Sequence, residues 1–184
     1  MGSTFKLFTA AMALDSGTIS MAGGYDASKP IRVARFTIKD FHAKNRWLSV
    51  PEIILHSSNI GAAKMAVDVG GPAQRAYLGK FGLLKPAGLE LPEVGAPLMP
   101  SVWRPINTMT ISYGHGISVS PVQVITGVTA LVNGGVYRKP TLLKRQGPPT
   151  AGLQVITPET SNNMRRLMRL VVSKGTGRKA NIHG

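Results

Sequence analysis

The chain has 184 residues, which suits one domain or a large part of one, and 43% of them are hydrophobic, enough to build a core. It contains no cysteine, which excludes disulfides, thiolate chemistry and zinc–cysteine sites. The formal net charge is +14, from 22 Lys and Arg against 8 Asp and Glu, and a charge of this size predicts an anionic substrate or partner. Only 6% of the residues are aromatic, which argues against a nucleic-acid surface built from stacked rings.

The first half of the chain reads as helices separated by short polar breaks. Residues 3–14 carry an apolar face behind a serine that can cap a helix, and a glycine follows at position 17. Apolar and polar residues alternate loosely over residues 31–38, and this pattern predicts one exposed strand. A capping box at residues 49–52 predicts a helix that runs to about residue 56. Two further helices are expected at about 60–69 and 72–81, since glycines follow both segments.

The second half combines irregular and helical segments. Residues 82–107 are rich in Pro and Gly and predict a long irregular excursion. The helix expected from residue 121 to about 133 is apolar on nearly every side, so we expect it to be buried. Residues 137–143 and 153–156 predict the strands of a hairpin. A last helix is expected from residue 158 to a break at Gly175.

Ser3 and Lys6 form a Ser-x-x-Lys pair at the predicted start of the first helix. Residues three apart share a helix face, so the lysine amine can accept the serine proton if its pKa is lowered. The pair also has an ordinary interpretation, in which Ser3 caps the helix and Lys6 is a solvated residue of the first turn. About one such pair is expected by chance in a chain of this length, so the pair alone does not identify a site.

Ser57 and Asn59 form a Ser-x-Asn triplet between two predicted helices. A hydroxyl and a carboxamide on one side of a short turn can relay a proton and hold a substrate amide. Serine and asparagine are also favoured in turns and caps, so this triplet has a purely structural interpretation as well.

The combination of the two motifs in this order resembles the penicillin-binding protein and serine β-lactamase superfamily. The surrounding residues resemble class B penicillin-binding proteins, in particular the division-specific peptidoglycan D,D-transpeptidases. The resemblance runs in one collinear order over essentially the whole chain, through residues 2–6, 50–53, 57–61, 80–83, 93–95, 112–123 and 133–137.

This resemblance implies roles for four residues. Ser3 is expected to be the acylated nucleophile, Lys6 its base and Ser57 a proton relay, while Asn59 is expected to bind the substrate amide. The implied substrates are the stem peptides of peptidoglycan, and β-lactam antibiotics are expected to acylate the same serine. No cofactor, metal ion or nucleic acid is expected. The implied location is the periplasmic face of the bacterial inner membrane, with membrane proteins of the division machinery as partners.

The resemblance also implies that residues 1–184 are part of a transpeptidase domain. The third motif of the family, Lys-Ser/Thr-Gly, does not occur in the sequence, and Lys174-Gly175-Thr176 has the wrong order. The expected fold is α+β: a mostly helical part of the DD-peptidase/β-lactamase-like fold that lacks most of its central antiparallel sheet, the motif strand and any membrane anchor. We expect the chain alone to be inactive, or nearly so, and marginally stable, because that strand would bind the substrate's carboxylate and complete the oxyanion site.

Three alternatives remain at the level of the sequence. A serine β-lactamase would need a glutamate that activates water, in a Glu-x-x-x-Asn context. Glu90 and Glu93 lack this context, and Glu159 matches it in spacing, with Asn163 four residues further on. A basic module that binds an anionic polymer would account for the net charge, although the cations are dispersed. A non-functional remnant of a transpeptidase is compatible with the same resemblance.

Overall fold

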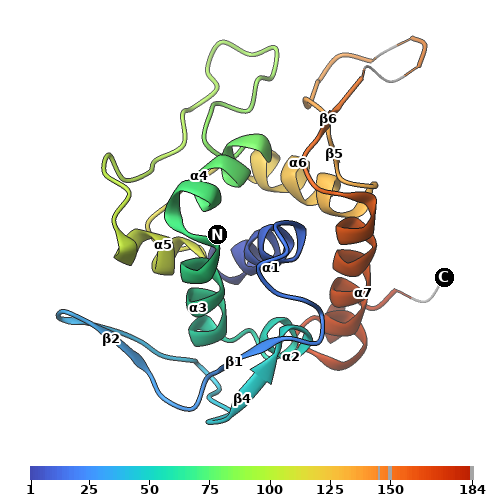
Figure 1. The fold of residues 1–184 in the computed structure, drawn as a ribbon. Helices are drawn as coiled ribbons and strands as arrows, with labels where there is room; N and C mark the ends of the chain where they lie inside the picture. Colours follow the sequence, from blue (N-terminus) through green and yellow to red (C-terminus); the bar gives the residue numbers. More distant parts are fainter. Residues whose placement is uncertain (145, 149–150, 183–184) are drawn as a thin grey trace.

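The computed structural model describes residues 1–144, 146–148 and 151–182, and their regular structure is mainly helical. Helix α1 lies at the centre of a ring of other helices (Figure 1) and contacts α2, α3, α4, α6 and α7. In chain order, the helices are η1 (Gly2–Thr4), α1 (Phe5–Asp15), α2 (Val50–Leu55), α3 (Asn59–Val69), α4 (Gly71–Lys80), α5 (Pro105–Ile111), α6 (Pro121–Val132), α7 (Pro158–Lys174) and η2 (Arg178–Ala180).

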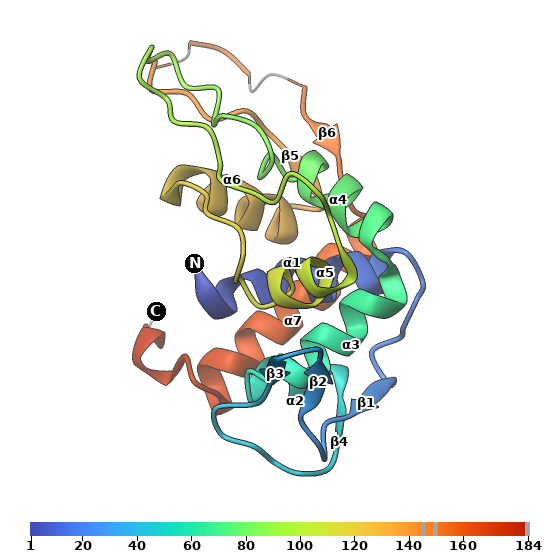
Figure 2. The same cartoon turned by 90° about the vertical axis from the view of Figure 1, so that its left-hand side faces the viewer.

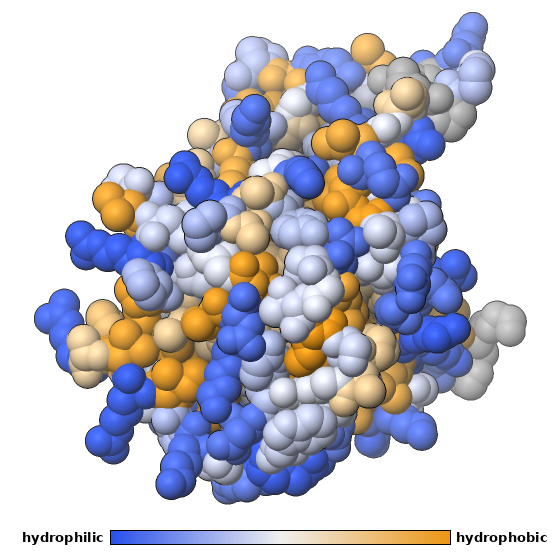
Figure 3. Space-filling model, in the orientation of Figure 1, coloured by the Kyte–Doolittle hydropathy of each residue, from blue (hydrophilic) through white to orange (hydrophobic). Residues whose placement is uncertain are grey.

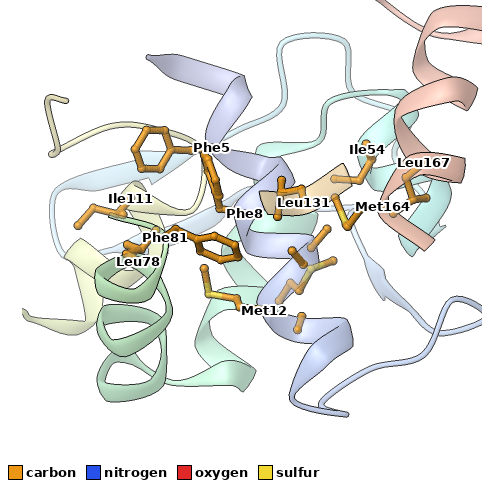
Figure 4. Packing of buried hydrophobic residues seen from close by; sticks show 14 of the residues in the cluster. Phe5, Phe8, Met12, Ile54, Leu78, Phe81, Ile111, Leu131, Met164 and Leu167 are labelled. Atoms are coloured by element: carbon orange, nitrogen blue, oxygen red, sulfur yellow. The ribbon is translucent and has the colours of Figure 1, made fainter. Parts of the chain in front are cut away.

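The core is built on the aromatic rings of α1 (Figure 4). Phe5 and Phe8 are fully buried and meet edge to face, with their ring centroids 5.7 Å apart. The ring of Phe8 also packs on Phe81, at the end of α4, with a centroid distance of 5.2 Å. Gly127 of α6 lies so close that an added Cβ would be 2.9 Å from the Phe8 ring. Helix α1 is therefore held from several sides, which fixes the position of its N-terminal end.

Strands contribute little to the described part of the chain. They form three antiparallel two-stranded ribbons, which pair β1 (Gly24–Asp26) with β4 (Trp47–Ser49), β2 (Ile31–Val33) with β3 (Phe36–Ile38), and β5 (Val136–Tyr137) with β6 (Leu153–Gln154). No larger sheet occurs in residues 1–144, 146–148 and 151–182. The mixed, mostly helical fold class expected from the sequence is confirmed.

The capping signals in the sequence are confirmed at α2 and α6. Ser49 and Glu52 make a reciprocal capping box, in which each side chain accepts a hydrogen bond from the other residue's backbone N–H. Ser120 and Gln123 do the same at α6. The predicted helix ends agree with the structure to within a residue or two, as local hydrogen bonding largely determines them.

Two predictions about residues 31–107 are wrong. Residues 31–38 form a hairpin and not one strand, because Ala34 takes a left-handed conformation (φ 50°) and turns the chain back. The irregular excursion predicted at 82–107 ends early, because α5 begins at Pro105, where proline suits the first helical turn.

Two predictions about residues 121–156 also need correction. Helix α6 is buried on one side only, and Ile125 on its outer side is 66% exposed, because no described segment covers that face. The hairpin predicted at 137–143 and 153–156 exists, but β5 and β6 have only two residues each. Beyond β5 the chain leaves its partner strand, and Glu90 accepts hydrogen bonds from Thr141 and from the backbone of Leu142 instead. In Figure 2 the loop that follows α4 and the chain that follows β5 extend side by side beyond α6.

None of the helices in the described residues is both long and apolar enough to cross a membrane.

Candidate active site

The side chains of Ser3, Lys6 and Ser57 meet at the N-terminal end of α1. The Lys6 Nζ donates hydrogen bonds to the Ser3 Oγ at 2.9 Å, the Ser57 Oγ at 2.8 Å and the Ser57 carbonyl oxygen at 2.7 Å. The Ser57 Oγ lies 3.0 Å from the Ser3 Oγ and donates to it. Three functional groups from two segments, 51 or more residues apart in the chain, therefore form one closed hydrogen-bonded triangle.

Ser3 does not cap α1, so the ordinary interpretation of this serine is wrong. It lies in the 3-10 turn η1, and no side chain caps either η1 or α1. Its hydroxyl is turned to Lys6 and Ser57 instead, and the residue is exposed. An exposed hydroxyl that contacts a buried amine is arranged to react with a molecule arriving from solvent.

Lys6 is only 3% exposed although it carries an ionisable amine. Burial strips water from the charged form and lowers the pKa of Lys6 to about 8, while the charge of Asp40 opposes this shift. As a cation, Lys6 uses its three N–H donors on the three acceptors around it. As a neutral amine it keeps two donors and gains a lone pair, which can accept the proton of a serine hydroxyl.

Ser57 occupies the turn between α2 and α3 in a left-handed conformation, with φ at 56°. This region costs a residue with a Cβ about 1–3 kcal/mol, so the surrounding structure must hold it there. The conformation lets both the hydroxyl and the carbonyl oxygen of Ser57 contact the Lys6 amine. Backbone strain at a serine with a reactive neighbour is a feature of functional sites.

Hydrogen bonds of Ser58 and Asp40 hold this turn in place. Ser58 is the N-cap of α3, where its Oγ accepts from the Gly61 N–H and donates to an Asp40 carboxylate oxygen at 2.7 Å. The other Asp40 oxygen accepts from the Ile60 N–H at 2.9 Å. The carboxylate is nearly buried, and it fixes the start of α3 two residues after Ser57.

Asn59 is the first residue of α3 and lies half-buried beside this turn. Its Nδ2 donates to the Lys39 carbonyl oxygen at 2.9 Å, which fixes the plane of the carboxamide. Within the described part of the chain, its Oδ1 accepts no hydrogen bond and is available to an amide N–H. Asn59 makes no direct hydrogen bond with Ser3 or Lys6.

The segment that precedes Ser3 rests on a glycine from a distant turn. An added Cβ on Gly114 would lie 2.2 Å from the Gly2 carbonyl oxygen, and Gly114 has a φ of 85°. Thr9 of α1 also donates to the Ser112 carbonyl oxygen at 2.9 Å. The turn around residues 112–116 therefore positions the end of α1 that carries Ser3.

The sequence motifs point to the side chains that meet at this site but not to the residues that support them. Ser3, Lys6 and Ser57 come together as the motifs predict, and Asn59 lies two residues further along the chain. The role of Asp40 has no local signal, because it lies 18 residues before Ser58. The contact between Gly114 and Gly2 has only a weak signal, in the two glycines that flank His115.

A serine hydroxyl next to an amine with a pKa near 8 is chemically suited to nucleophilic acyl transfer. The amine can remove the hydroxyl proton as the oxygen attacks a carbonyl carbon. A second hydroxyl, Ser57, can return a proton to the leaving group through the same hydrogen bonds.

Comparison with known proteins agrees with this chemistry. The curated relatives include a probable peptidoglycan D,D-transpeptidase FtsI from Caulobacter vibrioides, 40% identical over the whole of this chain and 32% of that protein. They also include stage V sporulation protein D from Bacillus subtilis, 30% identical over the whole chain and 31% of that protein. The chain thus spans about a third of the length of these relatives.

Solved structures share the same fold. The transpeptidase domain of penicillin-binding protein 3 from Burkholderia pseudomallei matches with a TM-score of 0.92 and 30% identity, over 98% of this chain and 56% of that one. A peptidoglycan glycosyltransferase from Burkholderia ambifaria matches with a TM-score of 0.91 and 31% identity, over 98% of this chain and 58% of that one. The family model of the penicillin-binding protein transpeptidase domain matches residues 1–184. The chain therefore belongs to the penicillin-binding protein transpeptidase domain family.

Proposed function

We propose that the chain carries the acylation centre of a class B peptidoglycan D,D-transpeptidase, with Ser3 as the nucleophile. The observation that carries the proposal is the hydrogen-bonded triangle of Ser3, Lys6 and Ser57. The family and the fold agree with it, and two of the relatives are named as a probable peptidoglycan D,D-transpeptidase and a peptidoglycan D,D-transpeptidase.

The reaction begins when the Ser3 Oγ attacks the carbonyl carbon of the penultimate D-Ala of a donor stem peptide. Neutral Lys6 takes the hydroxyl proton, and the pKa of about 8 keeps a useful fraction of the amine neutral near pH 7. The bond to the terminal D-Ala then breaks, and Ser57 passes a proton to the departing amine. Asn59 holds the donor amide through its free Oδ1.

The acyl group on Ser3 is transferred to an amine of a neighbouring strand, which forms the cross-link and restores the Ser3 hydroxyl. A β-lactam acylates Ser3 because its strained amide occupies the position of the donor's scissile amide. We assign this reaction to septal cell-wall synthesis at the periplasmic face of the inner membrane, with divisome membrane proteins as partners. This assignment rests on the similarity to relatives named FtsI.

We propose further that these 184 residues are one part of a transpeptidase domain. The sequence has no Lys-Ser/Thr-Gly, the motif that would line the opposite wall of the substrate groove. On this basis the chain alone is inactive or nearly so. Labelling of the purified 184-residue chain with a fluorescent penicillin tests this: stoichiometric labelling that depends on Ser3 would refute it.

The roles of the residues are tested in the longer protein that carries this sequence. Fluorescent penicillin should label it once per molecule, and Ser3→Ala should abolish the label. Lys6→Met should slow labelling by a factor of about 10²–10⁴, the usual contribution of a general base. Matched removal of an exposed lysine, in Lys174→Met, should leave the rate unchanged. Labelling that persists in Ser3→Ala would contradict the proposal.

A further inference from the structure

An arm made of residues 29–47 projects beyond the ring of helices next to the candidate active site (Figure 1). It contains the hairpin of β2 and β3 and the loop that leads from the hairpin to β4. Its root is joined to the site, since the Asn59 side chain donates to the Lys39 carbonyl oxygen and Asp40 binds the start of α3.

The arm is strongly basic. It carries six Lys or Arg residues and a single acidic residue, Asp40, whose carboxylate is committed to Ser58 and α3. Arg46 pairs with Glu52 at 2.7 Å, and that is the one ion pair in the described residues. Five other arm cations are exposed and form no ion pair within that part of the chain. Lys29 acts on the nearby Asp26, whose pKa its charge helps to lower. The other four are Arg32, Arg35, Lys39 and Lys44.

The arm also gathers the exposed aromatic rings. Every Phe or Trp that is exposed in the described residues lies in it: Phe41 is 91% exposed, Phe36 54% and Trp47 50%. The guanidinium of Arg35 lies 5.5 Å from the centre of the Phe36 ring. Figure 3 shows hydrophobic and hydrophilic side chains side by side at the lower left of the molecule, where Figure 1 places the hairpin. Large apolar rings held in water next to cations indicate a binding surface.

The hairpin is held in place from the other side. Ile31 and Ile38 are paired across it, and Ile38 is buried against Ala63 and Tyr113. Arg32 is paired with Thr37 and projects from the opposite face. One face is therefore anchored in the core, and the other presents its cations to solvent.

We propose that this arm binds the glycan strand that carries the stem peptides, through its sugar rings and peptide carboxylates. Aromatic rings can lie against the apolar faces of sugars, and the four cations complement free carboxylates on neighbouring stems. The site supports this occupant: Ser57 is two residues from Asn59, which places the root of the arm roughly 8 Å from the triangle. The arm is therefore within reach of a polymer engaged at Ser3. The inference rests on the proposed function, because that function supplies the polymer.

The test measures binding of fluorescently labelled, soluble, uncross-linked peptidoglycan strands to the chain by anisotropy. The arm variant replaces four of its cations, all but Lys29 and the paired Arg46, with glutamine: Arg32→Gln, Arg35→Gln, Lys39→Gln and Lys44→Gln. The matched control removes four cations from the exposed side of α7: Arg165→Gln, Arg166→Gln, Arg169→Gln and Lys174→Gln. Both lose the same charge, so a difference between them is due to position.

The arm variant should bind strands about tenfold more weakly or worse, with a flatter salt dependence, while the α7 control should change by less than about threefold. Phe41→Ser should also weaken binding, and amidation of the strand carboxylates should reproduce the loss. In a Trp103→Phe background Trp47 is the single tryptophan, so strand binding should shift its emission. Circular dichroism verifies that each variant is folded.

Equal weakening in the arm variant and the α7 control would overturn the proposal, since the effect would then be one of net charge. Absence of strand binding would overturn it too, as would binding to vesicles of anionic phospholipid in preference to strands. Penicillin labelling of Ser3 in the longer protein separates this inference from the proposed function. Intact labelling with no arm effect refutes the arm alone, and arm-dependent strand binding without labelling refutes the acylation centre.

Discussion

The buried amine of Lys6 should make the stability of the chain rise with pH above 8. Its pKa is lowered from the ordinary 10.5 to about 8 in the folded protein, because burial penalises the charged form. Between these two values the unfolded chain binds more protons than the folded chain. Stability therefore increases with pH across this window, and the increase is complete only above 10.5.

The gap between the two pKa values corresponds to about 3 kcal/mol over the whole window, and to about 2 kcal/mol between pH 8 and about 9.5. The measurement is best stopped at about pH 9.5. Above it the tyrosines act in the opposite direction, because burial and a hydrogen bond to Asp15 raise the pKa of Tyr77 to about 12. A group whose folded pKa is raised loses its stabilising effect as pH rises through that range.

The assay is urea unfolding, followed by circular dichroism, at pH 7.5, 8.5 and 9.5. The free energy of unfolding should rise through this series in the wild-type chain and stay flat in Lys6→Met. Lys174→Met removes an exposed lysine and should keep the wild-type slope. If the free energy of unfolding depends on pH in the same way in the wild type and in Lys6→Met, burial does not lower the pKa of Lys6 and the reasoning is refuted.

Three further predictions concern the supports of the site. Ser57→Gly relieves the strain of the left-handed conformation and should be about 1 kcal/mol more stable than Ser57→Ala in urea unfolding. Both substitutions should slow penicillin labelling of the longer protein. Equal stability of the two variants would mean that the turn is unstrained. Asp40→Asn leaves a donor facing Ser58 or the start of α3 and should lower the free energy of unfolding by about 1–3 kcal/mol; an unchanged midpoint would contradict the buried hydrogen bonds. Gly114→Ala should lower the melting temperature and the labelling rate more than Gly134→Ala does. Both glycines have a positive φ, but of the two only Gly114 would place an added Cβ against backbone atoms. Similar effects of the two substitutions would show that backbone strain alone matters.

The parts of the fold that could be predicted are those with local causes. The capping box of Ser49 and Glu52 placed α2, and the polar break at residues 57–59 separated α2 from α3. The hairpin at residues 31–38 has no signal in the sequence, because its turn uses Ala34 in a conformation that alanine rarely adopts. Helix α5 does not stand out in the sequence, because Pro105 follows a segment rich in Pro and Gly that predicts a loop, although proline also suits a first helical turn.

The candidate site likewise has residues that the sequence signals and residues that it does not. Ser3, Lys6 and Ser57 could be named because a family resemblance gave their motifs a meaning that spacing alone did not. Their contact depends on the packing of α1 against α2 and α3, which is a property of the whole core. Asp40 could not be found from its neighbours, since its partners lie 18 and 20 residues away.

Mass spectrometry of the longer protein after incubation with benzylpenicillin is the most direct test of the acylation centre. The account predicts one penicilloyl adduct per molecule, on the peptide that contains Ser3, formed faster as pH rises through about 8, where Lys6 loses its proton. It predicts no adduct in Ser3→Ala. An adduct on another residue, or an undiminished rate in Ser3→Ala, would contradict it.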